Sequence, residues 1–164
     1  MRLTSVRLEE DLTSLAELAE RYGIALDLPA NGPLAIEIEP DGSHRFNLVG
    51  FLPDGRQPPK AVIRVAERWR PVSGGVYERS AYRYELIDHE RDLRRAFHMH
   101  HAQEFERRFG VVVHEHCESP IGHAQCAHHF GPPVRDGFRA IEILMAAWVS
   151  DPPDCAALPC LEPI

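Results

Sequence analysis

Hydrophobic residues in the first part of the chain recur every three or four positions, which places them on one face of an α-helix. The spacing predicts a helix over residues 6–22. Ser5 is its expected N-cap, because a serine side chain accepts a hydrogen bond from the first turn of a helix. Gly23 is typical of the residue that follows a helix end. The residues that share this spacing are Leu8, Leu12, Leu15, Ala19 and Tyr22.

From residue 34 the hydrophobic period shortens to two, which indicates β-strands. Turn-forming residues separate the alternating segments, notably Pro40–Ser43 and Ser73–Gly75. Because these turns are short, we expect neighbouring strands to pair antiparallel. The predicted strands cover residues 34–39, 45–51, 61–72, 76–88, 91–100 and 111–117.

A second helix is predicted over Gly137–Val149, between two pairs of prolines that stop helices. Its hydrophobic stripe consists of Phe138, Ile141, Met145 and Trp148. The predicted fold class is α+β: a curved antiparallel β-sheet meander with an N-terminal helix and a C-terminal amphipathic helix covering one face. Residues 1–150 form one domain in this interpretation, and residues 151–164 form a loosely packed, proline-rich tail.

Composition and charge narrow the class of protein. The chain has 164 residues, 44% of them hydrophobic, and a net charge of −7, which is typical of a globular domain with a core. No segment has the layout of a signal peptide or the apolar length of a membrane span. We therefore expect a cytoplasmic protein with no membrane partner and with reduced cysteines. Basic residues concentrate in the middle of the chain, which favours a local phosphate-attracting patch there.

Eight of the ten histidines lie in one short stretch before the C-terminal helix. Four of them form two alternating pairs, His98/His100 and His114/His116. Because side chains alternate faces along a strand, both members of a pair project from the same face. The intervening residues are mainly hydrophobic and mark the opposite face as buried. If the two strands are adjacent, four imidazoles and Arg94 converge on one open surface.

Acid–base catalysis is the first chemistry that fits such a surface. His114 or His116 would take a proton from an attacking hydroxyl, and His98 or His100 would protonate the leaving oxygen. Arg94 would hold the phosphate and stabilise its negative charge. RNA suits this mechanism, because its own 2′-hydroxyl is the nucleophile and no metal is required.

Metal binding is the second chemistry, because neutral imidazoles are common ligands of zinc and other transition metals. In this alternative His98, His100, His114 and His116 are the ligands. Glu115, Cys117 or Glu118 would complete the coordination sphere. An open coordination position would permit hydrolysis, whereas a closed site would make the protein a non-catalytic zinc-binding or protein-interaction module.

Two further groups lie near the pairs in the sequence. Tyr82, Arg83 and Tyr84 occupy a strand expected beside the histidines, where they would stack a base or bind a phosphate. The other histidines fall in loops or at strand ends and are expected to be structural. They are His44, His89, His101, His123, His128 and His129.

The order of motifs over residues 76–149 is Tyr82-x-Tyr84, Phe97-His98-Met99-His100-His101, Val113-His114-Glu115-His116 and a helix preceded by proline. This order resembles the TumE-type toxin proteins of bacterial toxin–antitoxin pairs, and small relatives that carry F-H-x-H followed by P-H-x-H. Val113 stands where that family has proline. The resemblance implies that His98, His100, His114 and His116 form the functional patch. It also implies an antitoxin protein as partner and toxicity through RNA.

The sequence therefore favours a histidine-centred, nuclease-like toxin. It would be a hydrolase, either a ribonuclease that cleaves RNA or another phosphodiesterase. No cofactor is assigned, and zinc or another transition metal is the alternative. The sequence does not determine whether the protein forms a homodimer.

Overall fold

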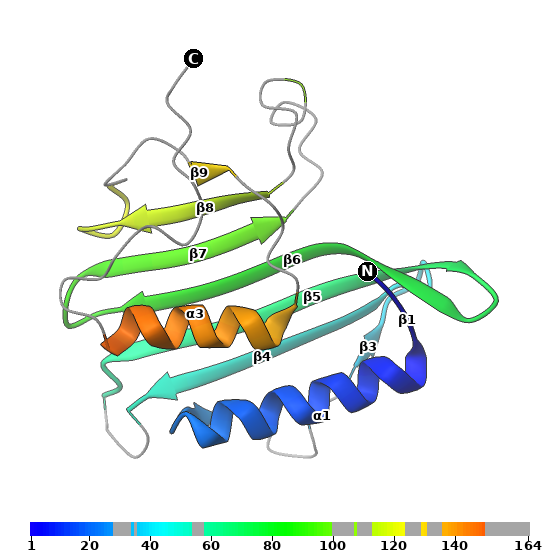
Figure 1. The fold of residues 1–164 in the computed structure, drawn as a ribbon, viewed down its shortest axis with the longest axis horizontal. Coiled ribbons are helices and arrows are strands. Elements are labelled where there is room, and N and C mark those ends of the chain that lie inside the picture. Colours follow the sequence, from blue (N-terminus) through cyan, green and yellow to red (C-terminus); the bar gives the residue numbers. More distant parts are fainter. Residues whose placement is uncertain are drawn as a thin grey trace.

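The computed structural model describes residues 1–27, 34, 36–53, 58–99, 107, 113–123, 129–130 and 136–149. Within these residues the chain forms an α+β fold, in which an antiparallel sheet carries two long helices on one face (Figure 1). The helices are α1 (Ser5–Arg21) and α3 (Gly137–Val149). Neither has the length and apolar character needed to cross a bilayer, and no other described helix does.

The described strands form one sheet in which each strand runs antiparallel to its partner. Strands β4 to β9 lie in chain order, β2 flanks β4, and β1 and β3 pair with β6 and β4. Their bounds are β1 (Arg2–Thr4), β2 (Ala25–Leu26), β3 (Glu37–Ile38), β4 (His44–Leu52), β5 (Ala61–Ser73), β6 (Val76–Asp88), β7 (Leu93–Met99), β8 (Val113–Glu118) and β9 (His129–Phe130).

Both predicted helices and the long strands appear close to their expected bounds. The helix cap differs: the side chain of Thr4, not Ser5, accepts a hydrogen bond from the backbone N–H of Arg7 at 3.3 Å. Among the described residues of the strand expected over residues 34–39, only β3 is extended and paired. His100 and the expected tail over residues 151–164 lie outside the described residues.

The hydrophobic core lies between the helices and one face of the sheet. Buried side chains from alternate positions of the strands meet buried side chains from α1 and α3. Each such apolar side chain stabilises the fold by roughly 1.5–3 kcal/mol, so burial fixes which face of each strand is left open. The fully buried contributors include Leu48, Ile63, Val65, Tyr84, Leu86, Phe97, Ile141 and Leu144.

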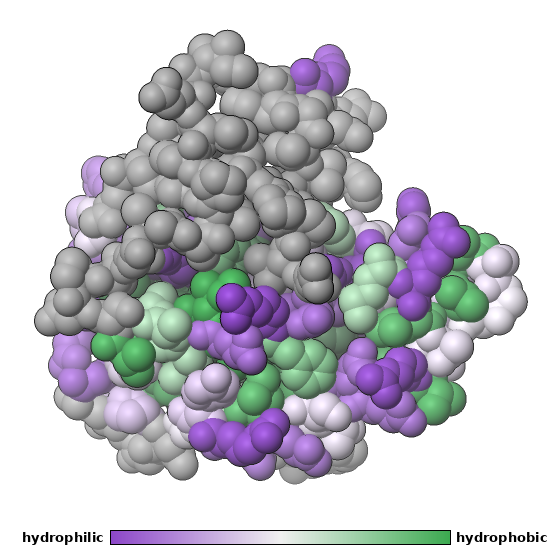
Figure 2. All heavy atoms as spheres, in the orientation of Figure 1, coloured by the Kyte–Doolittle hydropathy of each residue, from purple (hydrophilic) through white to green (hydrophobic). Residues whose placement is uncertain are grey.

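Gly137 permits the close approach of α3 to this layer. A Cβ atom at this position would lie 3.1 Å from side-chain atoms of both Leu15 in α1 and Val65 in β5. Figure 2 shows the helix-covered face, and hydrophobic and hydrophilic side chains are interspersed over its described part. That mixture is typical of a solvated surface.

The turn between β6 and β7 is tied to the end of α3. The buried side chain of Asp88 accepts hydrogen bonds from the backbone N–H groups of Glu90 and Arg91, each at 2.9 Å. The Arg91 guanidinium donates to the backbone oxygen of Trp148 at 2.8 Å and lies 5.2 Å from the centre of its ring. These contacts hold β7 in place beside β6, and β7 carries His98.

Candidate functional site

Strands β7 and β8 lie side by side, with His98 opposite His114 and Ala96 opposite His116. The expected adjacency of the two histidine strands is therefore confirmed. The rings of His98 and His116 have centroids 4.8 Å apart and planes inclined by 49°, and both residues are half-buried. The side chain of His114 and the whole of His100 lie outside the described part of the chain.

Glu118 contacts the imidazole of His116 and orients it. Its Oε1 lies 3.2 Å from Nδ1 of His116 and accepts a hydrogen bond from Arg94 at 2.6 Å. Its Oε2 accepts from the backbone N–H of Gly122 at 2.9 Å. Burial raises the pKa of Glu118, but the Gly122 N–H and the Arg94 guanidinium outweigh it and bring the pKa below its usual value. The carboxylate is thus ionised at neutral pH and favours the His116 tautomer with the proton on Nδ1, which leaves Nε2 as the basic nitrogen.

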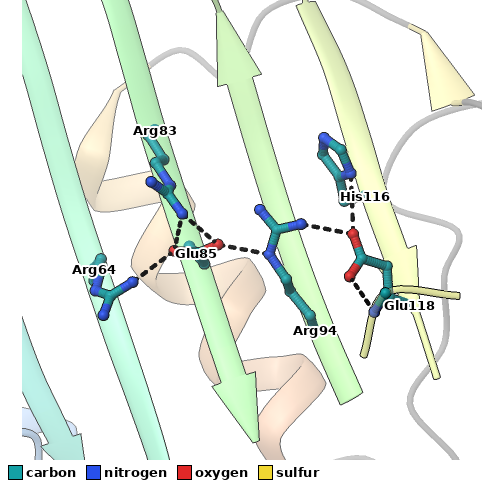
Figure 3. Close-up of polar contacts among 7 residues, drawn as sticks. Arg64, Arg83, Glu85, Arg94, His116 and Glu118 are labelled. Carbon is teal, nitrogen blue, oxygen red and sulfur yellow. Dashed lines mark hydrogen bonds and ion pairs between the residues drawn. The ribbon is translucent and has the colours of Figure 1, made fainter. Parts of the chain in front are cut away.

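Guanidinium groups surround a second carboxylate on the same face. The buried Glu85 accepts hydrogen bonds from Arg94 at 2.6 Å, Arg83 at 3.0 Å and Arg64 at 3.3 Å. Burial raises the pKa of Glu85, yet the Arg83 and Arg94 guanidiniums outweigh it and lower the pKa overall. Since three cations share this carboxylate, positive charge is in local excess. Figure 3 shows the cluster on the sheet face away from the helix: Arg64 from β5, Arg83 and Glu85 from β6, Arg94 from β7, and His116 and Glu118 from β8.

Arg94 lies on the predicted face, but its surroundings do not suit the phosphate clamp expected from the sequence. Its side chain is only 16% exposed, and its guanidinium already pairs with Glu85 and Glu118. An anion would have to displace one of these carboxylates to bind it. The side chains of Arg64 and Arg83 are 40% and 50% exposed. They are better placed for a phosphate, whereas Arg94 positions the two carboxylates.

Tyr82 and Tyr84 lie on the helix-covered face, so the expectation that they stack a base beside the histidines is wrong. Their rings stack on each other at 4.5 Å and are buried. The Tyr84 hydroxyl donates to Glu67 and accepts from Arg79 at 2.7 Å. Burial and the Glu67 carboxylate raise the pKa of Tyr84 well above its usual value. Arg83, between the two tyrosines, takes the open face instead, as strand alternation requires.

The residues expected to complete a metal site are divided between the two faces. Glu115 and Cys117 are buried on the helix-covered side, where Arg95 donates to the Glu115 carboxylate at 2.8 Å and contacts the Cys117 sulfur at 2.9 Å. Glu118 alone of the three shares the face of His116. In the part of the chain that the structure describes, no group of three or more His, Cys, Asp or Glu is placed to hold a metal ion.

Sequence reasoning missed Arg64 and Glu85 as members of the site. The pairing register places Arg64, Glu85, Ala96 and His116 in one row across β5 to β8. Alternation within each strand assigns the correct face to all four. It does not say which residues stand opposite each other, because register depends on turn lengths and packing.

Searches against protein-family models, characterised proteins and solved structures find no match for this chain. The functional conclusion therefore depends on the residues of the site.

Proposed function

We propose that the protein is a ribonuclease that uses His98 and His116 as an acid–base pair. One observation carries the proposal: two half-buried imidazoles lie 4.8 Å apart beside exposed guanidinium groups. Imidazoles this close can reach two oxygens of one phosphodiester. RNA is the substrate class because its 2′-hydroxyl supplies the nucleophile. In this proposal the sheet is a curved meander, and its open face binds the RNA.

His116 is the general base in this mechanism, because the ionised Glu118 fixes its orientation. It removes the proton of the 2′-hydroxyl as that oxygen attacks phosphorus. His98 is the general acid and protonates the 5′-oxygen as the P–O bond breaks. The products are a 2′,3′-cyclic phosphate and a 5′-hydroxyl. Arg83 and Arg64 stabilise the charge that develops on the non-bridging oxygens.

Single substitutions test the two histidines. His98→Ala and His116→Ala should each lower kcat on a fluorescent RNA by about 10²–10⁴-fold, with thermal midpoints close to that of the wild type. His89→Ala is the matched control, because His89 is exposed in the turn after β6. The wild-type profile of kcat against pH should be bell-shaped, as expected for one acid and one base. Cleavage at the wild-type rate by a His98→Ala/His116→Ala double variant would refute the proposal.

We further propose that the enzyme is the toxin of a toxin–antitoxin pair and acts in the cytoplasm. The motif order shared with TumE-type proteins supports this role, and an antitoxin protein that covers the open face would restrain the activity. Induced expression of the wild type should arrest growth of a bacterial host, and the double variant should not. Equal growth of the two strains would contradict the toxin role. Chromatography of the purified protein distinguishes a homodimer from a monomer.

Metal analysis separates this proposal from a zinc-binding or protein-interaction module that uses the same histidines. The protein is purified without an affinity tag and dialysed before measurement. Full cleavage activity without stoichiometric metal supports acid–base catalysis. One zinc ion per chain that survives dialysis, together with no cleavage, supports the module.

A further inference from the structure

The open face of β4, β5 and β6 forms a concavity of about 700 Å³ whose described lining does not include His98 or His116. Its floor is apolar and includes the half-buried side chains of Val49, Phe51 and Val62. Ala66 extends this floor toward Arg83 with little side-chain volume. The solvated face of an antiparallel sheet is normally polar. An aromatic ring and two valines in a concave part of it are therefore typical of a binding pocket.

Polar groups at the rim of the concavity connect it to the histidine site. Arg64 and Arg83 line the concavity and also belong to the cluster around Glu85. Asn47 is exposed on the opposite side of the same floor, and its amide offers both hydrogen-bond donors and acceptors. The rim also contains Asp27 and the ion pair between Glu37 and Arg45. An apolar floor with three guanidiniums and an amide at its edge suits a planar heterocycle attached to a phosphate.

The pairing register shows that the concavity and the histidine site are connected across the strands. Asn47, Ala66, Arg83 and His98 stand in one row across β4, β5, β6 and β7. Neighbouring strands lie about 4.8 Å apart, so Asn47 and His98 are separated by roughly 14 Å. This span is longer than a single nucleotide. Arg83 stands within it, and Arg64 lies two residues along β5 from Ala66. A chain bound to both ends would cross the strands rather than follow them.

We infer that this concavity is a nucleobase subsite that binds a base of single-stranded RNA one nucleotide or more away from the cleaved bond. The base stacks on Phe51 and the floor valines, and Asn47, four residues away on β4, hydrogen-bonds to the next base on the side of the histidines. Arg64 and Arg83 line the path of the backbone from that base to the cleaved phosphate. The strand must be single because a base within a duplex is stacked and cannot enter the pocket. The inference deepens the proposed function and rests on it for the identity of the substrate.

Binding without cleavage tests the subsite separately from catalysis. The full-length protein is titrated into a fluorescent 2′-O-methyl RNA octamer, which lacks the nucleophilic hydroxyl, and Kd is measured by anisotropy. Phe51→Ala should weaken binding by about 5- to 100-fold, since it removes one stacked base. Tyr22→Ala removes an exposed aromatic ring outside the concavity, at the end of α1, and should leave Kd unchanged.

Asn47→Ala is the second variant, and it avoids any loss of fold because Asn47 is exposed. It should reduce the difference in Kd between octamers of different base sequence while the thermal midpoint stays at the wild-type value. A duplex of the same sequence should bind more weakly than the single strand.

The outcomes separate the subsite from the catalytic proposal. Loss of binding with Phe51→Ala in a protein that never cleaves RNA would support the subsite and overturn the catalytic role. Wild-type Kd values for both Phe51→Ala and Asn47→Ala would overturn the subsite even if cleavage is confirmed. Equal affinity for duplex and single strand would overturn it as well.

Discussion

Replacement of Glu85 by glutamine should weaken the fold and strengthen RNA binding at the same time. Glu85 is buried, and its carboxylate is shared by Arg64, Arg83 and Arg94. Glutamine keeps the length of the side chain and one oxygen acceptor but removes the charge. The exposed guanidiniums of Arg64 and Arg83 then lose a competitor for phosphate.

The size of the stability loss follows from the exposure of each pair. Arg94 and Glu85 are 16% and 1% exposed and lie 2.6 Å apart, and hydrogen bonds to charged groups of this kind contribute about 1.5–3 kcal/mol. Arg64 and Arg83 are 40% and 50% exposed, so solvent screening reduces each of those pairs to about 0.2–1 kcal/mol. Because glutamine retains some hydrogen bonding, we expect Glu85→Gln to lower the free energy of unfolding by about 2–4 kcal/mol.

Urea denaturation at a series of pH values measures this loss. The pKa of Glu85 is lowered in the folded protein, so its ionised form stabilises the fold above the unfolded-state pKa of about 4.3. That contribution is lost as the pH falls through the lower, folded-state pKa. The difference in stability between wild type and Glu85→Gln should therefore be complete at pH 7 and shrink below about pH 4.

Glu37→Gln is the control variant. Glu37 pairs with Arg45 at 2.7 Å, but its side chain is 66% exposed, and the substitution should change stability by less than about 0.5 kcal/mol. The 2′-O-methyl octamer should bind Glu85→Gln more tightly than the wild type. The reasoning is refuted if Glu85→Gln unfolds like Glu37→Gln, or if its stability deficit is as large at pH 3 as at pH 7.

Three substitutions in the core test the packing that positions the site. Leu144→Ala, at a fully buried position of α3, should lower the free energy of unfolding by about 2–5 kcal/mol in urea denaturation. Val149→Ala, at an exposed position of the same helix, should leave it almost unchanged, and equal losses of stability would contradict the assigned buried face of α3. Tyr84→Phe removes the hydroxyl shared with Glu67 and should cost about 1–3 kcal/mol, whereas an unchanged unfolding midpoint would mean that the buried network adds no stability. Gly50→Ala would place a Cβ 2.2 Å from Cγ2 of buried Ile24 and should lower the free energy of unfolding by about 1–3 kcal/mol. A thermal midpoint equal to that of the wild type would rule out this close contact.

The elements that the sequence predicted well are those with many periods of hydrophobic residues. Helix α3 and strand β6 have the bounds expected from the pattern, because tertiary burial reinforces a long amphipathic repeat. Strands β2 and β9 have only two residues each and carry no readable period. Their existence depends on the neighbouring strands.

The site was predictable only in part, for a physical reason. Alternation along the strands assigned His98 and His116 to one face, and the ring contact agrees with that assignment. The partners of Arg94 depend on which residues stand opposite each other across three strands. Glu85 and Glu118 therefore could not be linked to it in advance. Burial of Tyr84 was missed because tyrosine is common on both faces of a sheet, and its partners Glu67 and Arg79 are distant in the chain.

The most direct measurement uses a DNA oligonucleotide that contains a single ribonucleotide, incubated with the tag-free protein in the presence of a metal chelator. If His98 and His116 transfer protons to and from one phosphodiester, the oligonucleotide is cut only on the 3′ side of that ribose and leaves a 2′,3′-cyclic phosphate. The all-DNA oligonucleotide stays intact. Cleavage of both oligonucleotides at the same rate, or no cleavage of either one, would contradict the account.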